Sequence, residues 1–111
     1  MRTRIKICGL REVEHVHLAA REGADAIGLN FHPASPRAVT PDVAARLVAA
    51  MPPFVAAVGL FVDASEATIS SILARVPLDL LQFHGDESPE ACERWGRPYI
   101  KAIAWRRGSI W

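Results

Sequence analysis

The feature that most constrains the fold is a repeated alternation of short, mostly apolar runs with stretches of helical periodicity. The strand-like runs are residues 4–8, 26–31, 54–62, 80–84 and 99–104. Between most of them, apolar residues recur at i, i+3, i+4 and i+7, which is the spacing of one buried helix face. Buried strands that alternate with amphipathic helices predict a parallel sheet covered by helices, an α/β fold.

Helix starts and ends support this interpretation. Thr40, Ser65 and Ser88 are hydroxyl residues in N-cap positions, and a proline follows Thr40 and Ser88 at the first helical position. Gly23 follows the first helix, where a left-handed residue is common. The predicted helices cover residues 12–22, 40–51, 65–76 and 88–96.

The periodicity leaves the type of parallel sheet open. On spacing alone, five strands in 111 residues suit an open, doubly wound, flavodoxin-like sheet first. A second observation favours a barrel, because most of the strands end in polar or reactive residues. A barrel gathers all its strand ends around one mouth, whereas an open sheet uses mainly the crevice where its strand order reverses. The strand-end residues are Cys8, Asn30 with His32, Asp63, and His84 with Asp86.

Length, charge and hydropathy restrict the functional classes. The 111 residues suit one domain, and the formal net charge of +1 provides no global field for nucleic acid or an anionic membrane. The longest apolar run, residues 54–62, is well short of the roughly 20 residues that span a bilayer. The first residues do not have the pattern of a signal peptide. We therefore expect a cytoplasmic protein.

The two cysteines have different expected roles. Cys8 and Cys92 are far apart and form no CxxC or zinc-ligand spacing, so neither a disulfide nor a metal site is expected. Cys92 is expected to be buried, as most free cysteines are. Cys8 ends a strand just before Gly9, and it fits a small core residue and a reactive thiolate equally well. Lys6, two residues earlier on the same strand face, could help a thiolate to form.

Three further side chains are candidate ligand-binding residues. Arg37 lies in a proline-rich loop, where it could be a solvated charge or a bidentate hydrogen-bond donor to a carboxylate or phosphate. Gln82 and His84 point to the same side of a strand, and a polar pair facing an apolar interior is costly unless it has partners. We therefore favour a functional role for this pair. Asp86 and Glu87 are expected to form an ordinary acidic turn before a helix.

The chain resembles the phosphoribosylanthranilate isomerase family in six blocks, which fall in the family's order. These blocks are IKICGL (5–10), GADAIG (23–28), SPR (35–37), VGLFV (58–62), LQFHGDE (81–87) and IKAI (100–103). The resemblance implies an eight-stranded (β/α)8 TIM barrel and an isomerase of tryptophan biosynthesis. Its reaction is the Amadori rearrangement of N-(5-phosphoribosyl)anthranilate to 1-(2-carboxyphenylamino)-1-deoxyribulose 5-phosphate, which needs neither a metal nor an organic cofactor. Indoleglycerol-phosphate synthase, another phosphate-sugar barrel enzyme, fits less well because it lacks the Cys8 block.

The resemblance also implies roles for individual residues. Cys8 matches the general base, Arg37 matches the arginine that binds the anthranilate carboxylate, and Gln82 and His84 match residues that line the substrate pocket. The family's general acid ends the sixth strand, and its phosphate loops follow the seventh and eighth. Residues 1–103 match the first five strands, so we expect an incomplete barrel with about five β/α units.

Residues 104–111 form an atypical tail, which suggests a truncated or frame-shifted product. The alternative function is a non-catalytic half barrel that acts as an assembly or folding partner. Open strand edges would favour self-association or pairing with a C-terminal barrel fragment.

We predict that the 111-residue polypeptide alone is nearly inactive as an isomerase. Loss of one general acid or base costs about 10²–10⁴-fold in rate, before any loss of substrate binding. The decay of substrate fluorescence measures the turnover. A rate close to that of a complete family member would contradict the prediction.

Overall fold

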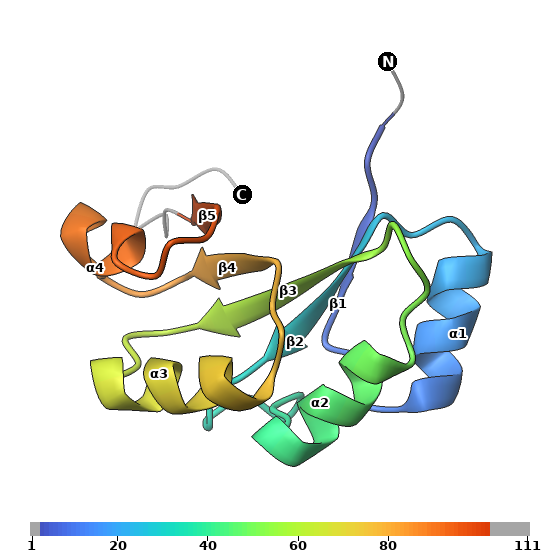
Figure 1. The fold of residues 1–111 in the computed structure, drawn as a ribbon, viewed down its shortest axis with the longest axis horizontal. Helices are drawn as coiled ribbons and strands as arrows, with labels where there is room; N and C mark the ends of the chain where they lie inside the picture. The colour runs from blue at the N-terminus through green and yellow to red at the C-terminus, as the bar shows by residue number, and fades with distance from the viewer. Residues whose placement is uncertain (1–2, 103–111) are drawn as a thin grey trace, which may run out of the picture.

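The computed structural model describes residues 3–102, and within them strands and helices alternate (Figure 1). The order is β1 (Lys6–Cys8), α1 (Val13–Arg21), β2 (Ala26–Asn30), α2 (Pro41–Ala49), β3 (Ala56–Phe61), α3 (Glu66–Arg75), β4 (Leu80–Phe83), α4 (Pro89–Glu93) and β5 (Tyr99–Lys101). Each predicted strand and helix is present, most of them a few residues shorter than expected. The predicted tail, residues 104–111, lies outside the described residues.

The helix boundaries follow the predicted signals. The side-chain oxygens of Thr40, Ser65 and Ser88 accept hydrogen bonds from the backbone N–H groups three residues later. Each bond satisfies an N–H that has no partner within its helix. Gly23 follows α1 with a φ of 99°, a conformation that costs glycine little.

The order of strands decides between the two kinds of parallel sheet. The five described strands are all parallel and lie in the order β1-β2-β3-β4-β5. A flavodoxin-like sheet would have the order 2-1-3-4-5, with a reversal. The preference for an open sheet on spacing alone is therefore wrong, and the barrel favoured by the polar strand ends is confirmed. Figure 1 shows α1, α2 and α3 on the same side of the sheet, as sequential winding requires.

A contact between distant strands shows how strongly the sheet curls. Lys6 Nζ on β1 donates a hydrogen bond to Gln82 Oε1 on β4, although β2 and β3 lie between them. In a flat sheet, three strand spacings near 4.8 Å and an offset of four residues along the strands would separate Lys6 from Gln82 by about 19 Å, more than the two side chains span together. The curl is that of an incomplete barrel, and the face that carries Lys6 is its inner face.

The main core fills the space between the outer face of the sheet and the helices. Aromatic rings form a row across the strands, with centroids 5.4 Å apart for Phe31 and Phe61 and 6.2 Å apart for Phe61 and Phe83. Cys92, 1% exposed, belongs to this core, as predicted. Among residues 3–102, no helix is long and apolar enough to cross a membrane.

Candidate active site

Cys8 ends β1 on the inner face of the curled sheet and is exposed. It pairs in register with Gly28 of β2, and a Cβ atom built on Gly28 would lie only 2.7 Å from Cys8 Sγ. Glycine at position 28 therefore makes room for the sulfur. Within the described residues the thiol of Cys8 is open to a ligand.

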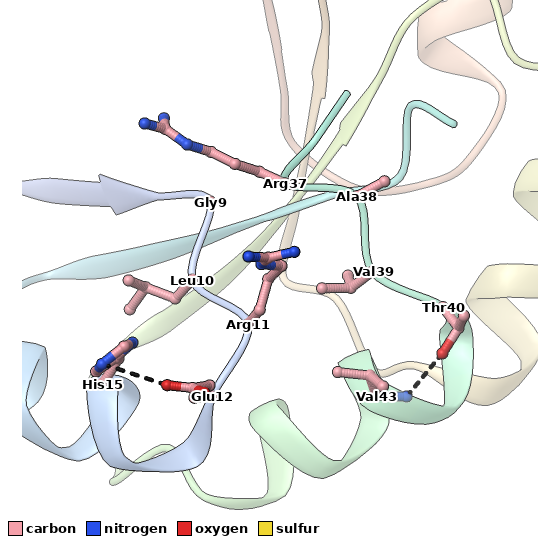
Figure 2. Close-up of a pocket in the computed structure, with 10 residues that line it drawn as sticks. All are labelled: Gly9, Leu10, Arg11, Glu12, His15, Arg37, Ala38, Val39, Thr40 and Val43. Carbon is pink, nitrogen blue, oxygen red and sulfur yellow. Dashed lines mark hydrogen bonds and ion pairs between the residues drawn. The ribbon is translucent and has the colours of Figure 1, made fainter. Parts of the chain in front are cut away.

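Arg37 lies beside the end of the same strand. Gly9 follows Cys8 with a φ of 87°, and a Cβ atom there would come within 2.6 Å of Arg37 Cδ. The arginine stem thus crosses the backbone directly after Cys8. Figure 2 shows the guanidinium extending past Gly9, away from the other labelled side chains.

The loop that carries Arg37 is held by hydrogen bonds to its own residues and to the loop after β1. Ser35 Oγ accepts bonds from Asn30 Nδ2 at 3.2 Å and from the backbone N–H of Arg37 at 3.1 Å. Arg11 donates to the carbonyl oxygen of Pro36 at 3.1 Å. These bonds fix the backbone of Arg37. The guanidinium group has no hydrogen-bond partner among residues 3–102, so it is left for a ligand.

A hollow of about 520 Å³ lies below Arg37, between the loops after β1 and β2. Its lining includes Arg11, Glu12 and His15, and Glu12 lies 3.4 Å from the His15 ring (Figure 2). Cys8, Gln82 and His84 do not line this hollow, because they face the open inner side of the sheet. Arg37 borders both the hollow and the strand end of Cys8.

Gln82 and His84 lie on the same side of the end of β4, as predicted. Gln82 Nε2 is 3.3 Å from His84 Nε2, and Gln82 Oε1 accepts from Lys6. Lys6 is therefore bonded to β4, whereas the sequence predicted a role for this lysine only beside Cys8. Lys6 and Gln82 both lie on the inner face, and a polar side chain on an otherwise apolar strand face was the available signal, because it needs a partner.

The sequence predicted that Glu87 forms part of an ordinary acidic turn, but in the structure it belongs to an ion pair. Its side chain is 7% exposed, and Glu87 Oε1 lies 2.7 Å from Lys101 Nζ on β5. Its second oxygen accepts from the backbone N–H of Asp63 at 2.8 Å. Lys101 also donates to the carbonyl oxygen of Gly85. A lysine within an apolar strand was the overlooked signal, because such a charge needs a partner.

The pKa values of this ion pair shift in opposite directions. Burial raises the pKa of Glu87, but the hydrogen bonds from Lys101 and from the Asp63 backbone outweigh it, so the net pKa is below the usual value. The bond to Glu87 raises the pKa of Lys101. Both residues are therefore held in their charged forms, and the pair ties together the ends of β3, β4 and β5.

The described residues contain no group of three or more His, Cys, Asp or Glu side chains placed to hold a metal ion. What they do bring to one edge is a thiol, a guanidinium and an imidazole, at the carboxyl ends of parallel strands. This is the edge where barrel enzymes carry their active sites. The fold and the site together define the chain as part of a (β/α)8-barrel protein with its functional groups at the C-terminal mouth.

Comparison with known proteins identifies the family. The family model for N-(5'-phosphoribosyl)anthranilate isomerase matches residues 5–108, and the chain belongs to this family. The isomerase of Azotobacter vinelandii is 60% identical over 106 residues, which cover 96% of this chain and 52% of the relative. The chain thus spans about half the length of the curated relatives that it matches.

Solved structures agree with this assignment. The phosphoribosylanthranilate isomerase of Thermotoga maritima superposes with a TM-score of 0.87 at 36% identity, over 92% of this chain and 51% of that one. A second structure of such an isomerase, in complex with reduced 1-(o-carboxyphenylamino)-1-deoxyribulose 5-phosphate, gives the same TM-score and identity over 92% and 54%.

We predict that removing either member of the Glu87–Lys101 pair destabilises the fold. Lys101→Met leaves a buried carboxylate without its cation, which should lower the free energy of unfolding by about 1–3 kcal/mol at pH 7. Urea titration followed by circular dichroism measures the change.

The same pair predicts a pH dependence. Because folding lowers the pKa of Glu87, its stabilising contribution is complete above the unfolded value, about 4.3, and is lost as the pH falls through the folded value. Glu87→Gln should therefore lose less stability than the wild type between pH 7 and acidic pH. Glu90→Gln, an exposed acid in the first turn of α4, is the control. An equal loss in wild type and Glu87→Gln would contradict the assignment.

Proposed function

We propose that this half barrel provides the base and the carboxylate-binding side of a phosphoribosylanthranilate isomerase that acts in the cytoplasm. The substrate would be N-(5-phosphoribosyl)anthranilate and the product 1-(2-carboxyphenylamino)-1-deoxyribulose 5-phosphate, a step of tryptophan biosynthesis. The observation that carries the proposal is the Arg37 stem crossing Gly9, directly after the exposed Cys8. A carboxylate-binding group thereby lies beside a thiol.

The proposed chemistry divides into ring opening and proton removal. A general acid protonates the furanose ring oxygen, and the ring opens to a Schiff base. Cys8, as thiolate, then removes the proton from C2 of the sugar, and the resulting enolamine tautomerises to the ketone. The planar guanidinium of Arg37 pairs with the two oxygens of the anthranilate carboxylate and orients the sugar toward the sulfur.

The other groups of the site complete this assignment. Gln82 and His84 lie on the inner face with Lys6 and would contact the sugar part of the substrate. The ring-opening acid and the phosphate loops belong, in the family, to strands six to eight. The reduced 1-(o-carboxyphenylamino)-1-deoxyribulose 5-phosphate bound to a family member of the same fold supports a phosphosugar ligand here.

A chimera tests the proposal directly. Residues 3–102 of this chain replace the matching segment of the Azotobacter vinelandii isomerase, which is 60% identical. We predict an active chimera in which Cys8→Ala lowers kcat by about 10²–10⁴-fold. Arg37→Ala should instead raise KM by roughly 10–100-fold, the effect of losing a charge-assisted hydrogen bond. Fluorescence decay of the substrate provides both constants.

Two matched controls accompany these variants. Cys92→Ala removes the buried thiol and should lower the stability but leave kcat unchanged. Arg21→Ala removes a cation from the last turn of α1, at the opposite edge of the sheet, and should leave KM unchanged. Full turnover in Cys8→Ala would exclude this residue as the base, and a folded but inactive chimera would reject the function.

A second candidate function, a half barrel that assembles with a partner, is supported by the edges of the sheet. Within residues 3–102, β1 and β5 each pair with one neighbour only. Ile100 of β5 is 45% exposed, and Ile5 beside β1 is 46% exposed. Both edges therefore offer backbone groups and apolar surface to further strands.

We predict that the 111-residue chain self-associates and that a fragment carrying strands six to eight of the Azotobacter vinelandii relative dissociates these assemblies. The reason is that correct edge strands bury the surface that otherwise joins copies of the chain. Analytical ultracentrifugation of the chain, with and without the fragment, measures both effects. The prediction would be contradicted by a monodisperse monomer that melts cooperatively and whose sedimentation does not change when the fragment is added.

A further inference from the structure

We propose that Lys6 and Gln82 form a directional hydrogen-bond relay that holds His84 in its Nδ1–H tautomer. His84 then presents an N–H donor to an oxygen atom of the ligand, and Gln82 acts as a positioning residue. The proposal refines the proposed function, on which its choice of ligand rests. The relay itself depends only on side chains of β1 and of the β4 strand end.

The relay crosses the inner face of the sheet. Lys6 Nζ donates to Gln82 Oε1, and Gln82 Nε2 lies 3.3 Å from His84 Nε2. Lys6 and Gln82 are 76 positions apart in the chain and meet only because the sheet curls. In the sheet register Lys6 lies at the level of Ala26 and Ala56, whereas Gln82 pairs with Leu60 of β3, so the contact runs diagonally across the inner face.

The direction of the relay follows from which groups can donate. A lysine ammonium has three donors and no acceptor, so the oxygen of the Gln82 amide must face Lys6. The NH₂ group of the same amide must then face His84. A ring nitrogen that accepts a hydrogen bond carries no proton, so the proton of a neutral His84 lies on Nδ1.

This arrangement separates the roles of the two residues at the β4 strand end. The amide oxygen of Gln82 is occupied by Lys6, and one of its N–H groups is directed at His84. His84 is exposed at the mouth, and its Nδ1–H remains for a ligand. The matching ligand group is an acceptor such as a hydroxyl, carboxylate or phosphate oxygen, which a phosphosugar offers in abundance.

The ¹⁵N shifts of the imidazole nitrogens test the relay, because protonated and unprotonated ring nitrogens resonate far apart. Long-range ¹H–¹⁵N spectra are recorded at pH 8, above the usual imidazole pKa of about 6.5, for the full chain and for the chimera. The loss of signals in His84→Asn assigns the ring. We expect Nδ1 protonated and Nε2 unprotonated in the wild type. A proton on Nε2 would overturn the proposal.

Two variants invert or release the relay. Gln82→Glu places a carboxylate between Lys6 and His84, so His84 must donate from Nε2 and its tautomer should invert. Lys6→Met lets the Gln82 amide rotate and should shift His84 toward a mixture of tautomers. Arg4→Met, which removes an exposed cation two residues before Lys6 and outside β1, should change nothing. An unchanged tautomer in Gln82→Glu or Lys6→Met would overturn the relay.

The spectra need no substrate, so the relay and the proposed function fail separately. A wild-type Nδ1–H signal in an inactive chimera would support the relay and reject the isomerase assignment. An active chimera in which Nε2 of His84 carries the proton would support the isomerase assignment and reject the relay.

Discussion

The curl of the parallel sheet is the constraint on which the rest of the structure depends. On the inner face, the small residues Ala26 and Gly28 of β2 lie in register with Lys6 and Cys8 of β1, and Ala56 of β3 lies in register with Ala26. Any side chain larger than hydrogen at position 28 would meet Cys8 Sγ. The same curl brings Lys6 of β1 to Gln82 of β4, so the curvature of the sheet supports both the space for Cys8 and this polar contact.

An ion pair and the hydrogen bonds around it stabilise the loops that follow β3 and β4. Glu87, Lys101 and Asp63 join the ends of β3, β4 and β5 through bonds that bury a carboxylate almost completely. Asp63 has a φ of 47°, and its carboxylate occupies the space that a Cβ atom on Gly85 would need. Gly85 and the strained Asp63 are therefore packed against each other, and Gly85 directly follows His84 in the chain.

The division of the site across the chain follows from barrel geometry. Each strand of a barrel contributes to one mouth, so a stretch that spans about half of its relatives' length can carry several functional groups of a larger site. In the proposed isomerase, Cys8 and Arg37 serve proton removal and carboxylate binding, and both belong to the first two β/α units. In the same proposal, ring opening and phosphate binding draw on strands other than the five described.

The sequence by itself determined the elements, the helix caps and the common face of Gln82 and His84, because these features depend on neighbours within a few residues. Periodicity could not determine the strand order, and on spacing alone it favoured the wrong one. Only the tertiary structure decided that Lys6 meets Gln82 and that Glu87 is buried against Lys101. Both contacts join residues from different strands, and their energies depend on the curl and burial of the assembled sheet, which no local pattern encodes.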